Sequence, residues 1–346
     1  MAERAALPRV VARLLARALP YALAVAAAFA AAGVFLAALG FDVGRAYATI
    51  LLTSFRTPFS FAQTLVKFAP LLLQALAFTL PLTARKFNIG GEGQLIVGAI
   101  GAAAVGIALA DLHAAFLLPA AVAAGILFGA LWAALPAWLL YRFGINEILT
   151  TVLMNFVSFG LIDYVATEIW PDRAAGHPTT VAVGAGAWMP LLVVRPPVHA
   201  GVLLALGAAV LVHFYVRRTV GGYELVATGA NPRAASVYGI AVRRVFLSSL
   251  VLGGALAGLS GAIEVSGVHH RLIEGMQSNF LLLGIIVGLI AKGNNAAVPF
   301  VAFFIAVLDV GASALQRTMG VPVEIGFIVQ ALVLIFVLLS DVVRRR

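Results

Sequence analysis

The chain has 346 residues, of which 62% are hydrophobic and only 11% are charged. Soluble domains carry about 25% charged residues, so this composition excludes an ordinary cytosolic enzyme, a disordered chain and a nucleic-acid-binding protein. The absence of cysteine also excludes disulfides, thiol catalysis and cysteine-ligated metal sites. We therefore expect an all-α polytopic membrane protein, in which the net charge of +9 reports orientation in the lipid bilayer.

Ten segments have the length and composition to cross the bilayer, which requires about 20 apolar residues. The first follows four arginines in residues 1–17, as in a secretory signal. Its 23 apolar positions exceed the 7–15 of a cleavable signal, so we expect an uncleaved anchor. The third opens on a glycine-rich run, and the eighth has only 13 uninterrupted residues. The predicted spans are 18–40, 63–84, 90–110, 114–140, 147–168, 200–216, 245–267, 279–291, 297–316 and 322–341.

The distribution of basic residues predicts the orientation of these spans. With the N-terminus inside, sixteen of the 23 basic residues fall in inner segments and seven on the outer side. Both termini are then cytoplasmic, and the number of spans is even. The chain is expected to form one transmembrane domain over 1–346, with a basic N-terminus (1–17), an extracytoplasmic loop (169–199) and a cytoplasmic connection (217–244).

Polar residues interrupt the inner end of the third span. Asn88, Glu92 and Gln94 lie among three glycines, each of which weakens a helix by roughly 1 kcal/mol. Irregular backbone at membrane depth persists only where protein or a water-filled cavity surrounds it, and transporters build substrate sites this way. These residues therefore either line a substrate pathway or form a simple loop and helix start at the interface.

A polar stripe runs along the fifth span. Its members are spaced by 4, 4 and 3 residues, which places them on one helix face within an arc of about 80°. Such a stripe faces a pathway or hydrogen-bonds to another helix, but it does not face lipid. Its members are Glu147, Thr151, Asn155 and Ser158.

In the seventh span, the pair Gly254 and Gly258 forms a GxxxG motif that predicts close helix packing.

The cytoplasmic connection contains a second unusual segment. Gly229 and Pro232 bracket a predicted turn at Ala230-Asn231, and residues 232–238 are expected to form a short helix with Asn231 as its N-cap and Gly239 at its end. A short helix across the cytoplasmic face is a docking surface for a partner, or else an ordinary loop.

One enzyme signature is present in the seventh span. Residues Gly258-Leu259-Ser260-Gly261 match the GxSG of intramembrane serine proteases. That chemistry requires a histidine within hydrogen-bond reach of the serine, and no histidine is placed at the depth of Ser260 on another span. HExxH and Walker A motifs are absent from the sequence. We therefore expect the chain to be no enzyme and to bind no metal or cofactor itself.

Five motifs, in order along the chain from about residue 60, resemble one family. They are Phe87-Asn88-Ile89-Gly90-Gly91-Glu92-Gly93-Gln94, Asn146 to Asn155, Ala227 to Ala235, Gly267 to Leu272 and Ala314 to Pro322. The resemblance is to bacterial ABC importer permeases that serve ribose, branched-chain amino acids and nucleosides, in particular the nucleoside-type branch. After residue 272 the chain departs from the usual glycine-rich pattern, with Gln277 and Asn279 at positions that could alter what the pathway accepts.

The resemblance implies a multi-pass permease of the bacterial cytoplasmic membrane that imports a small polar solute such as a nucleoside. It implies three kinds of partner: a second permease subunit or a second copy of the chain, two ATPase subunits that bind ATP and Mg, and an extracytoplasmic substrate-binding protein. Residues 224–240 then resemble a coupling helix that docks on the ATPase. The positions carried over to that role are Glu224, Gly229, Asn231 and Arg233.

Two further expectations follow from this arrangement. Spans 2–5 and 7–10 could be related halves, because the interrupted third and eighth spans occupy matching places. The alternative function is an ion-coupled secondary transporter that works without ATPase subunits, with Glu92, Asp163 or Asp309 as the coupling carboxylate. An intramembrane protease is the remaining alternative.

Overall fold

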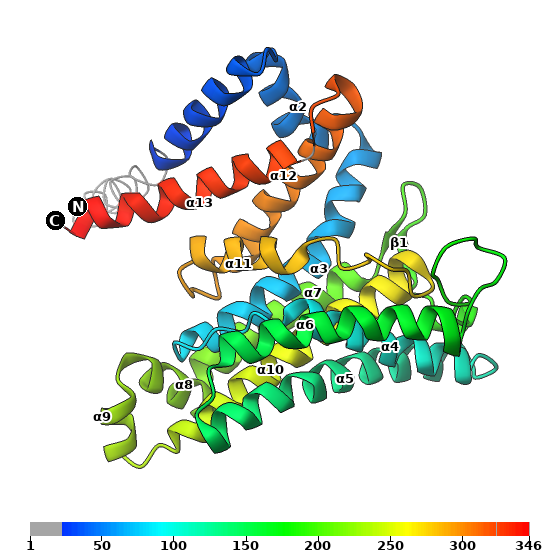
Figure 1. Cartoon of the computed structure of the whole chain (residues 1–346), viewed down its shortest axis with the longest axis vertical. Coiled ribbons are helices and arrows are strands. Elements are labelled where there is room, and N and C mark those ends of the chain that lie inside the picture. The colour runs from blue at the N-terminus through cyan, green and yellow to red at the C-terminus, as the bar shows by residue number, and fades with distance from the viewer. Residues whose placement is uncertain (1–22, 323, 346) are drawn as a thin grey trace, which may run out of the picture. The chain divides into compact units, whose positions relative to one another are not determined.

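The structure is a computed structural model, which describes residues 23–322 and 324–345 (Figure 1). The predicted basic segment 1–17 and the first residues of the predicted first span lie outside the described residues. Within the described part, seven helices are long and apolar enough to cross a membrane. They are α3 (Pro58–Thr83), α4 (Gly91–Ala108), α5 (Ala114–Phe143), α6 with the π-helical turn η1 (Glu147–Ile169), α7 (Gly201–Arg218), α10 with the π-helical turn η3 (Val242–His269) and α12 (Val298–Met319).

Three shorter apolar helices fall on the first, eighth and tenth predicted spans. They are Leu23–Ala38, α11 (Phe280–Ile290) and the apolar part Glu324–Ser340 of α13 (Glu324–Arg345). With 11 residues, α11 is about 16 Å long, roughly half of the hydrocarbon thickness. The all-α polytopic class is therefore confirmed. The number of crossings, the cytoplasmic placement of both termini and the relation between two halves stay predictions.

Helix α2 (Val43–Arg56) was missed by the sequence analysis. It lies between the first two predicted spans, where a connection was expected. Its N-cap is Asp42, whose carboxylate accepts a hydrogen bond of 2.9 Å from the backbone N–H of Arg45. Its buried face includes Ile50, and Gly311 of α12 packs directly on the Ile50 backbone. The helix is amphipathic, and it therefore lacks the continuous apolar run that marks a span.

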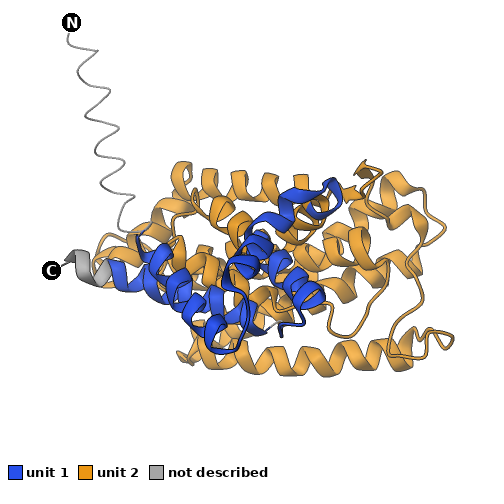
Figure 2. Cartoon of the chain, turned by 90° about the horizontal axis from the view of Figure 1, so that it is seen from above, with its two compact units in different colours: residues 1–60, 307–346 blue, residues 61–306 orange. Residues whose placement is uncertain are grey.

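The chain divides into two compact units, which Figure 2 shows in different colours. One unit comprises residues 1–60 and 307–346, and the other comprises residues 61–306. Every residue predicted to line the pathway or to couple to an ATPase belongs to the second unit. The prediction of a single domain over the whole chain is not decided by this division.

The centre of the second unit is a close three-helix contact among α4, α5 and α10. Glycines let these helices approach: Gly258 of α10 lies against the Gly125 carbonyl and the Gly129 backbone of α5, and Gly98 of α4 lies against Gly258. A methyl group at Gly258 would overlap the Gly125 carbonyl oxygen. The packing role predicted for the GxxxG motif of the seventh span is therefore confirmed.

The long connection 169–199 is held against the chain that follows α10. Thr179 Oγ1 donates a hydrogen bond of 2.7 Å to the Leu272 carbonyl, and the Met189 backbone N–H donates one of 2.8 Å to the Ser266 carbonyl. The connection also contains a small hairpin of β1 (Leu191–Val193) and β2 (Val198–His199), which the sequence analysis did not predict. At the opposite end of this unit lie α8 (Val220–Ala230) and α9 (Pro232–Val237) (Figure 1).

His199 gives this connection a predicted pH dependence. The side chain is 2% exposed, and burial, together with nearby His270, lowers its pKa to about 4. In the unfolded chain this histidine binds a proton below about pH 6.5, whereas in the folded chain it does so only below about pH 4. The neutral His199 therefore contributes its full share of the folding stability above pH 6.5, and this contribution is lost as the pH falls toward 4. We expect acidification across this window to cost up to about 3 kcal/mol in thermal unfolding experiments.

The matched variants are His199→Gln and His177→Gln, because His177 is an exposed histidine on the same connection. The first is expected to flatten the slope of stability against pH, and the second is expected to leave it unchanged. Equal slopes in the wild type and in His199→Gln would show that another group causes the acid sensitivity.

Candidate functional site

The irregular segment before α4 is held by two buried amide side chains. Asn88 and Gln94 are each 1% exposed, and they exchange two hydrogen bonds of 2.8 Å, Asn88 Nδ2 to Gln94 Oε1 and Gln94 Nε2 to Asn88 Oδ1. Asn88 Oδ1 also accepts from the Gly90 backbone N–H at 3.2 Å. The chain is thus non-helical before Gly91 because side chains, rather than a preceding helical turn, satisfy its polar groups.

Helix α6 holds the same segment from the other side. Asn155 Nδ2 donates a hydrogen bond of 2.8 Å to the Ile89 carbonyl, and Asn155 Oδ1 accepts one of 2.8 Å from the Gly93 backbone N–H. A Cβ at Gly93 would lie 3.0 Å from that oxygen and 2.9 Å from Trp132 Nε1, so a larger residue here would have to displace both side chains. We refer to Asn88, Gln94 and Asn155 as the amide clasp.

The two hydroxyl side chains of the α6 stripe form hydrogen bonds within their own helix. Thr151 Oγ1 donates to the Glu147 carbonyl and Ser158 Oγ to the Asn155 carbonyl, both at 2.6 Å. Both side chains are buried. The stripe predicted from the sequence does face protein rather than lipid. Its observed bonds join helices or stabilise α6, and its role in a substrate pathway stays a prediction.

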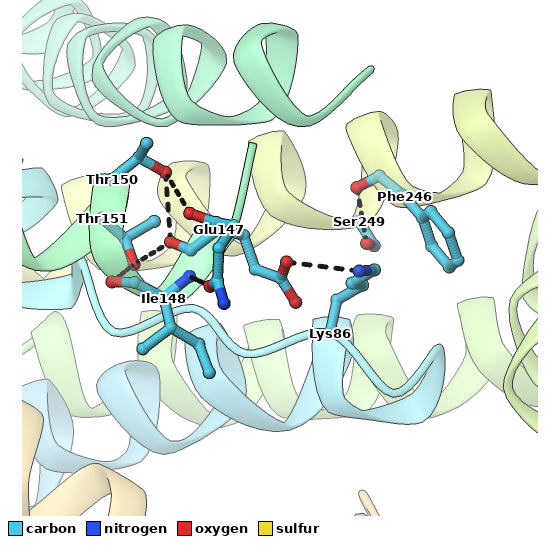
Figure 3. A network of polar contacts seen from close by, with 8 residues as sticks. Lys86, Glu147, Ile148, Thr150, Thr151, Phe246 and Ser249 are labelled. Carbon is cyan, nitrogen blue, oxygen red and sulfur yellow. Dashed lines mark hydrogen bonds and ion pairs between the residues drawn. The ribbon is translucent and has the colours of Figure 1, made fainter. Parts of the chain in front are cut away.

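The first residue of the stripe forms an ion pair, which Figure 3 shows at the start of α6. Lys86 Nζ lies 3.2 Å from Glu147 Oε2 and 4.7 Å from the centre of the Phe246 ring. Asn146 caps the helix by accepting a hydrogen bond of 2.8 Å from the Ile148 backbone N–H. Attraction to Glu147 and to the aromatic face together fix the Lys86 side chain beside the first turn of α6.

Glu92 differs from the rest of the predicted pathway residues. It is half-buried in the first turn of α4, where the helix dipole favours a carboxylate. Within the described part of the chain, its side chain makes no hydrogen bond or ion pair. Of the seven predicted pathway positions, it is the one whose polar atoms are not committed to holding the fold.

The amide clasp leads to a stability prediction. Replacing Gln94 with leucine leaves the Asn88 amide buried without its main partner, and we expect the free energy of unfolding to fall by about 1–3 kcal/mol. Thermal unfolding of the purified protein measures this change. Gln316→Leu is the matched control, because Gln316 is exposed, and its effect is expected to stay within about 0.5 kcal/mol. Equal effects of the two variants would contradict the clasp.

A further polar cluster was missed by the sequence analysis. Gln74, near the middle of α3, donates hydrogen bonds to Ser260 Oγ at 2.9 Å and to the Gly91 carbonyl at 3.1 Å. Ser260 Oγ in turn donates to the Ala257 carbonyl at 2.7 Å, and the residue is fully buried. A lone glutamine within an apolar span was the available signal. Ser260 thus has a hydrogen-bond partner on α3, and within the described residues no hydrogen bond joins it to a histidine.

The predicted coupling segment consists of two helices. The turn predicted at Ala230-Asn231 is wrong in part, because α8 continues through Ala230 and only Asn231 is extended. The predicted cap is confirmed: Asn231 Oδ1 accepts hydrogen bonds of 3.1 Å from the backbone N–H groups of Arg233 and Ala234. The predicted stop is also confirmed, since Gly239 has a φ of +85°.

Helix α8 is seated on the end of α3. Gly229 lies directly against the Thr83 carbonyl, and an added Cβ would overlap that oxygen. Glu224 is half-buried, whereas Arg233 is exposed. The end of α9 carries two exposed apolar side chains that the sequence analysis did not single out, Val237 at 84% and Tyr238 at 86% exposed.

An arginine-rich cavity of about 370 Å³ lies in the unit that comprises residues 1–60 and 307–346. Arg45, Arg56 and Arg317 line it together with hydroxyl side chains such as Thr53 and Thr57, and none of the described lining residues is acidic. Guanidinium groups in such a setting bind carboxylates and phosphates. These three arginines are among the basic residues assigned to the outer side from the sequence.

Comparison with known proteins decides the family. Residues 60–338 match the family described as the permease component of branched-chain amino acid transport systems. The chain belongs to this permease family. It is 34% identical to the glucose ABC transporter permease protein TsgB13 of Haloferax volcanii, over 90% of this chain and 85% of that protein.

Two other relatives of this permease family are named for nucleosides. The guanosine ABC transporter permease protein NupP of Bacillus subtilis is 30% identical over 88% of each chain. The nucleoside ABC transporter permease protein NupB of Lactococcus lactis is 26% identical over 90% of this chain and 87% of that protein. The chain is therefore a multi-pass ABC transporter permease, and its relatives indicate no enzyme function.

Proposed function

We propose that this chain is the membrane-spanning subunit of an ATP-driven importer that carries nucleosides across the bacterial cytoplasmic membrane. The observation that supports nucleosides is that NupP and NupB, both named for them, align with almost the whole chain. Glucose is the second candidate solute, because TsgB13 aligns over a similar length.

The solute can be tested with the assembled transporter in proteoliposomes. Uptake of labelled guanosine is expected to require ATP and the binding protein, and an excess of unlabelled nucleoside is expected to suppress it. Glucose in the same excess is expected to have no effect. Uptake of glucose but not of guanosine would contradict nucleosides as the solute and would support sugars instead. Uptake driven by a proton or sodium gradient without ATPase subunits would contradict an ATP-driven importer.

The pair α8–α9 is proposed as the surface that couples to the ATPase subunits, which bind ATP and Mg. Asn231 caps α9, Gly229 seats α8 on α3, and Arg233 is exposed for contact with a partner. Val237 and Tyr238 add an exposed apolar end that fits a groove on another protein. Glu224 is half-buried on α8, and its proposed part is to hold α8 in place.

Two further partners are proposed. The arginine-rich cavity formed by Arg45, Arg56 and Arg317 has the chemistry to receive carboxylates of an extracytoplasmic binding protein. A second permease subunit is proposed because Haloferax volcanii and Bacillus subtilis each have another related permease, TsgC13 and NupQ, beside TsgB13 and NupP. A second copy of this chain is the alternative.

Among the predicted pathway positions, Glu92 is proposed as the side chain most available to the solute.

A further inference from the structure

A small polar cavity of about 240 Å³ lies behind the proposed coupling helices. Three basic side chains from two elements line it: His213 and Arg217 come from the last turns of α7, and Lys292 comes from the chain that follows α11. None of the described residues that line the cavity is acidic. A cavity of this size is smaller than most pockets for drug-sized ligands, and it suits a single charged group.

Amide side chains complete the cavity. Asn294 and Asn295 both line it, and Asn295 is only 6% exposed. In the described structure, Asn295 Oδ1 is buried without a hydrogen-bond partner. Buried polar atoms are almost always paired in folded proteins, so this oxygen points to a ligand that carries a hydroxyl group, as a protonated phosphate does. A half-turn of the amide would present its two N–H donors instead.

The combination of a guanidinium, an ammonium and amide groups matches the chemistry of a phosphate group. Arginine supplies paired N–H donors for phosphate oxygens, and lysine supplies a compact positive charge. Basic residues at the inner ends of helices are also expected from orientation alone. Orientation accounts for the charge, but it does not account for the buried Asn295 Oδ1 that lacks a hydrogen-bond partner.

The cavity is joined structurally to the coupling helices. Val226 of α8 lines one side of it. Thr83 lines another, and the Thr83 carbonyl is the atom on which Gly229 of α8 is seated. A ligand held between Arg217 and Lys292 would therefore contact α8 and the end of α3 at once, and would restrain α8 in its observed position.

We propose that this cavity binds a phosphate-bearing anion and that the bound anion stabilises the seat of α8. The phosphate belongs either to the headgroup of an anionic phospholipid or to a soluble metabolite. The last turns of α7 and helix α8 line the cavity, and the predicted topology places them at the cytoplasmic face, where both sources are present. Because binding is measured directly, the proposal stands apart from the identity of the transported solute.

The test uses the assembled transporter in nanodiscs of phosphatidylcholine. One arm titrates inorganic phosphate and pyrophosphate and follows the thermal unfolding midpoint. The other arm adds phosphatidylglycerol to the nanodiscs and measures, by native mass spectrometry, how much stays bound to the complex. Arg217→Gln and Lys292→Gln are each expected to weaken binding about tenfold, since a charge-assisted hydrogen bond of this kind is worth roughly 1.4 kcal/mol.

The matched control is Arg218→Gln, which removes the same charge from the next residue, an exposed one that does not line the cavity. It is expected to change binding less than twofold. Binding in the phosphate arm supports a soluble ligand, and binding in the lipid arm supports a headgroup. Absence of binding in both arms overturns the proposal, as does an equal loss in Arg218→Gln.

A second variant guards against a simple failure of assembly. Asn295→Asp keeps the shape of the side chain but places a negative charge in the cavity, and it is expected to weaken anion binding at least tenfold. Unchanged binding by an assembled Asn295→Asp transporter would overturn the proposal.

Discussion

Replacement of Gly229 with alanine is expected to reduce ATP-driven uptake at least about fivefold. The added methyl group would overlap the Thr83 carbonyl oxygen and lie 3.0 Å from the Thr83 carbonyl carbon and 3.2 Å from the Ala84 Cα. All three are backbone atoms and cannot turn aside, so α8 must move away from α3. Overpacking of this kind costs typically 1–3 kcal/mol, which is a factor of about 5 to 150 in an equilibrium.

The measurements are solute uptake and solute-stimulated ATP hydrolysis by the assembled transporter. Gly207→Ala is the matched control, because an added Cβ there meets no heavy atom within 4 Å. It is expected to transport as the wild type does. Wild-type uptake by Gly229→Ala would contradict the proposed seat of α8. Loss of the folded permease in Gly229→Ala would assign its effect to the fold as a whole rather than to coupling.

The helix positions could be predicted because the bilayer imposes a simple rule of length and hydropathy. The same rule hides helices that do not follow it. Helix α2 carries Arg45 and Arg56 on an amphipathic sequence, and it was read as a connection. Helix α8 contains three glycines, and its Gly229 was predicted to lie beside a turn. Gly222 and Gly229 are instead positions where the helix touches neighbouring backbone, at Tyr215 and Thr83.

The candidate site was predictable as a set of residues but not as a set of contacts. A spacing of 4, 4 and 3 correctly placed Asn155 on a protein-facing side of α6, because helical periodicity determines the face. Periodicity cannot say what that face meets. The partners of Asn155 are Ile89 and Gly93, more than sixty positions earlier in the chain. Gln74 was missed for a related reason, since a single polar residue in an apolar run has no periodicity.

The central contact of α4, α5 and α10 leads to the largest expected effect on folding, in the variant Gly258→Ala. In an unpacked helix this change would stabilise, since alanine is better than glycine by about 1 kcal/mol. Here the new methyl group would overlap the Gly125 carbonyl oxygen and lie 2.9 Å from the Gly129 Cα. Gly98 of α4 already packs against Gly258, so α10 cannot move away from α5 without disturbing α4.

Both neighbours of Gly258 are backbone, so we expect Gly258→Ala to lower the free energy of unfolding by about 3 kcal/mol, the upper end of the usual cost of overpacking. Thermal unfolding and the recovery of monodisperse protein in detergent measure this loss. Gly160→Ala on α6 is the matched control, because an added Cβ there has no heavy atom within 4 Å. It is expected to be neutral or stabilising by up to about 1 kcal/mol, so only Gly258→Ala should lower the free energy of unfolding. A Gly258→Ala protein as stable as Gly160→Ala would mean that the three helices do not approach as closely as described, because the same methyl group has room at one position and none at the other.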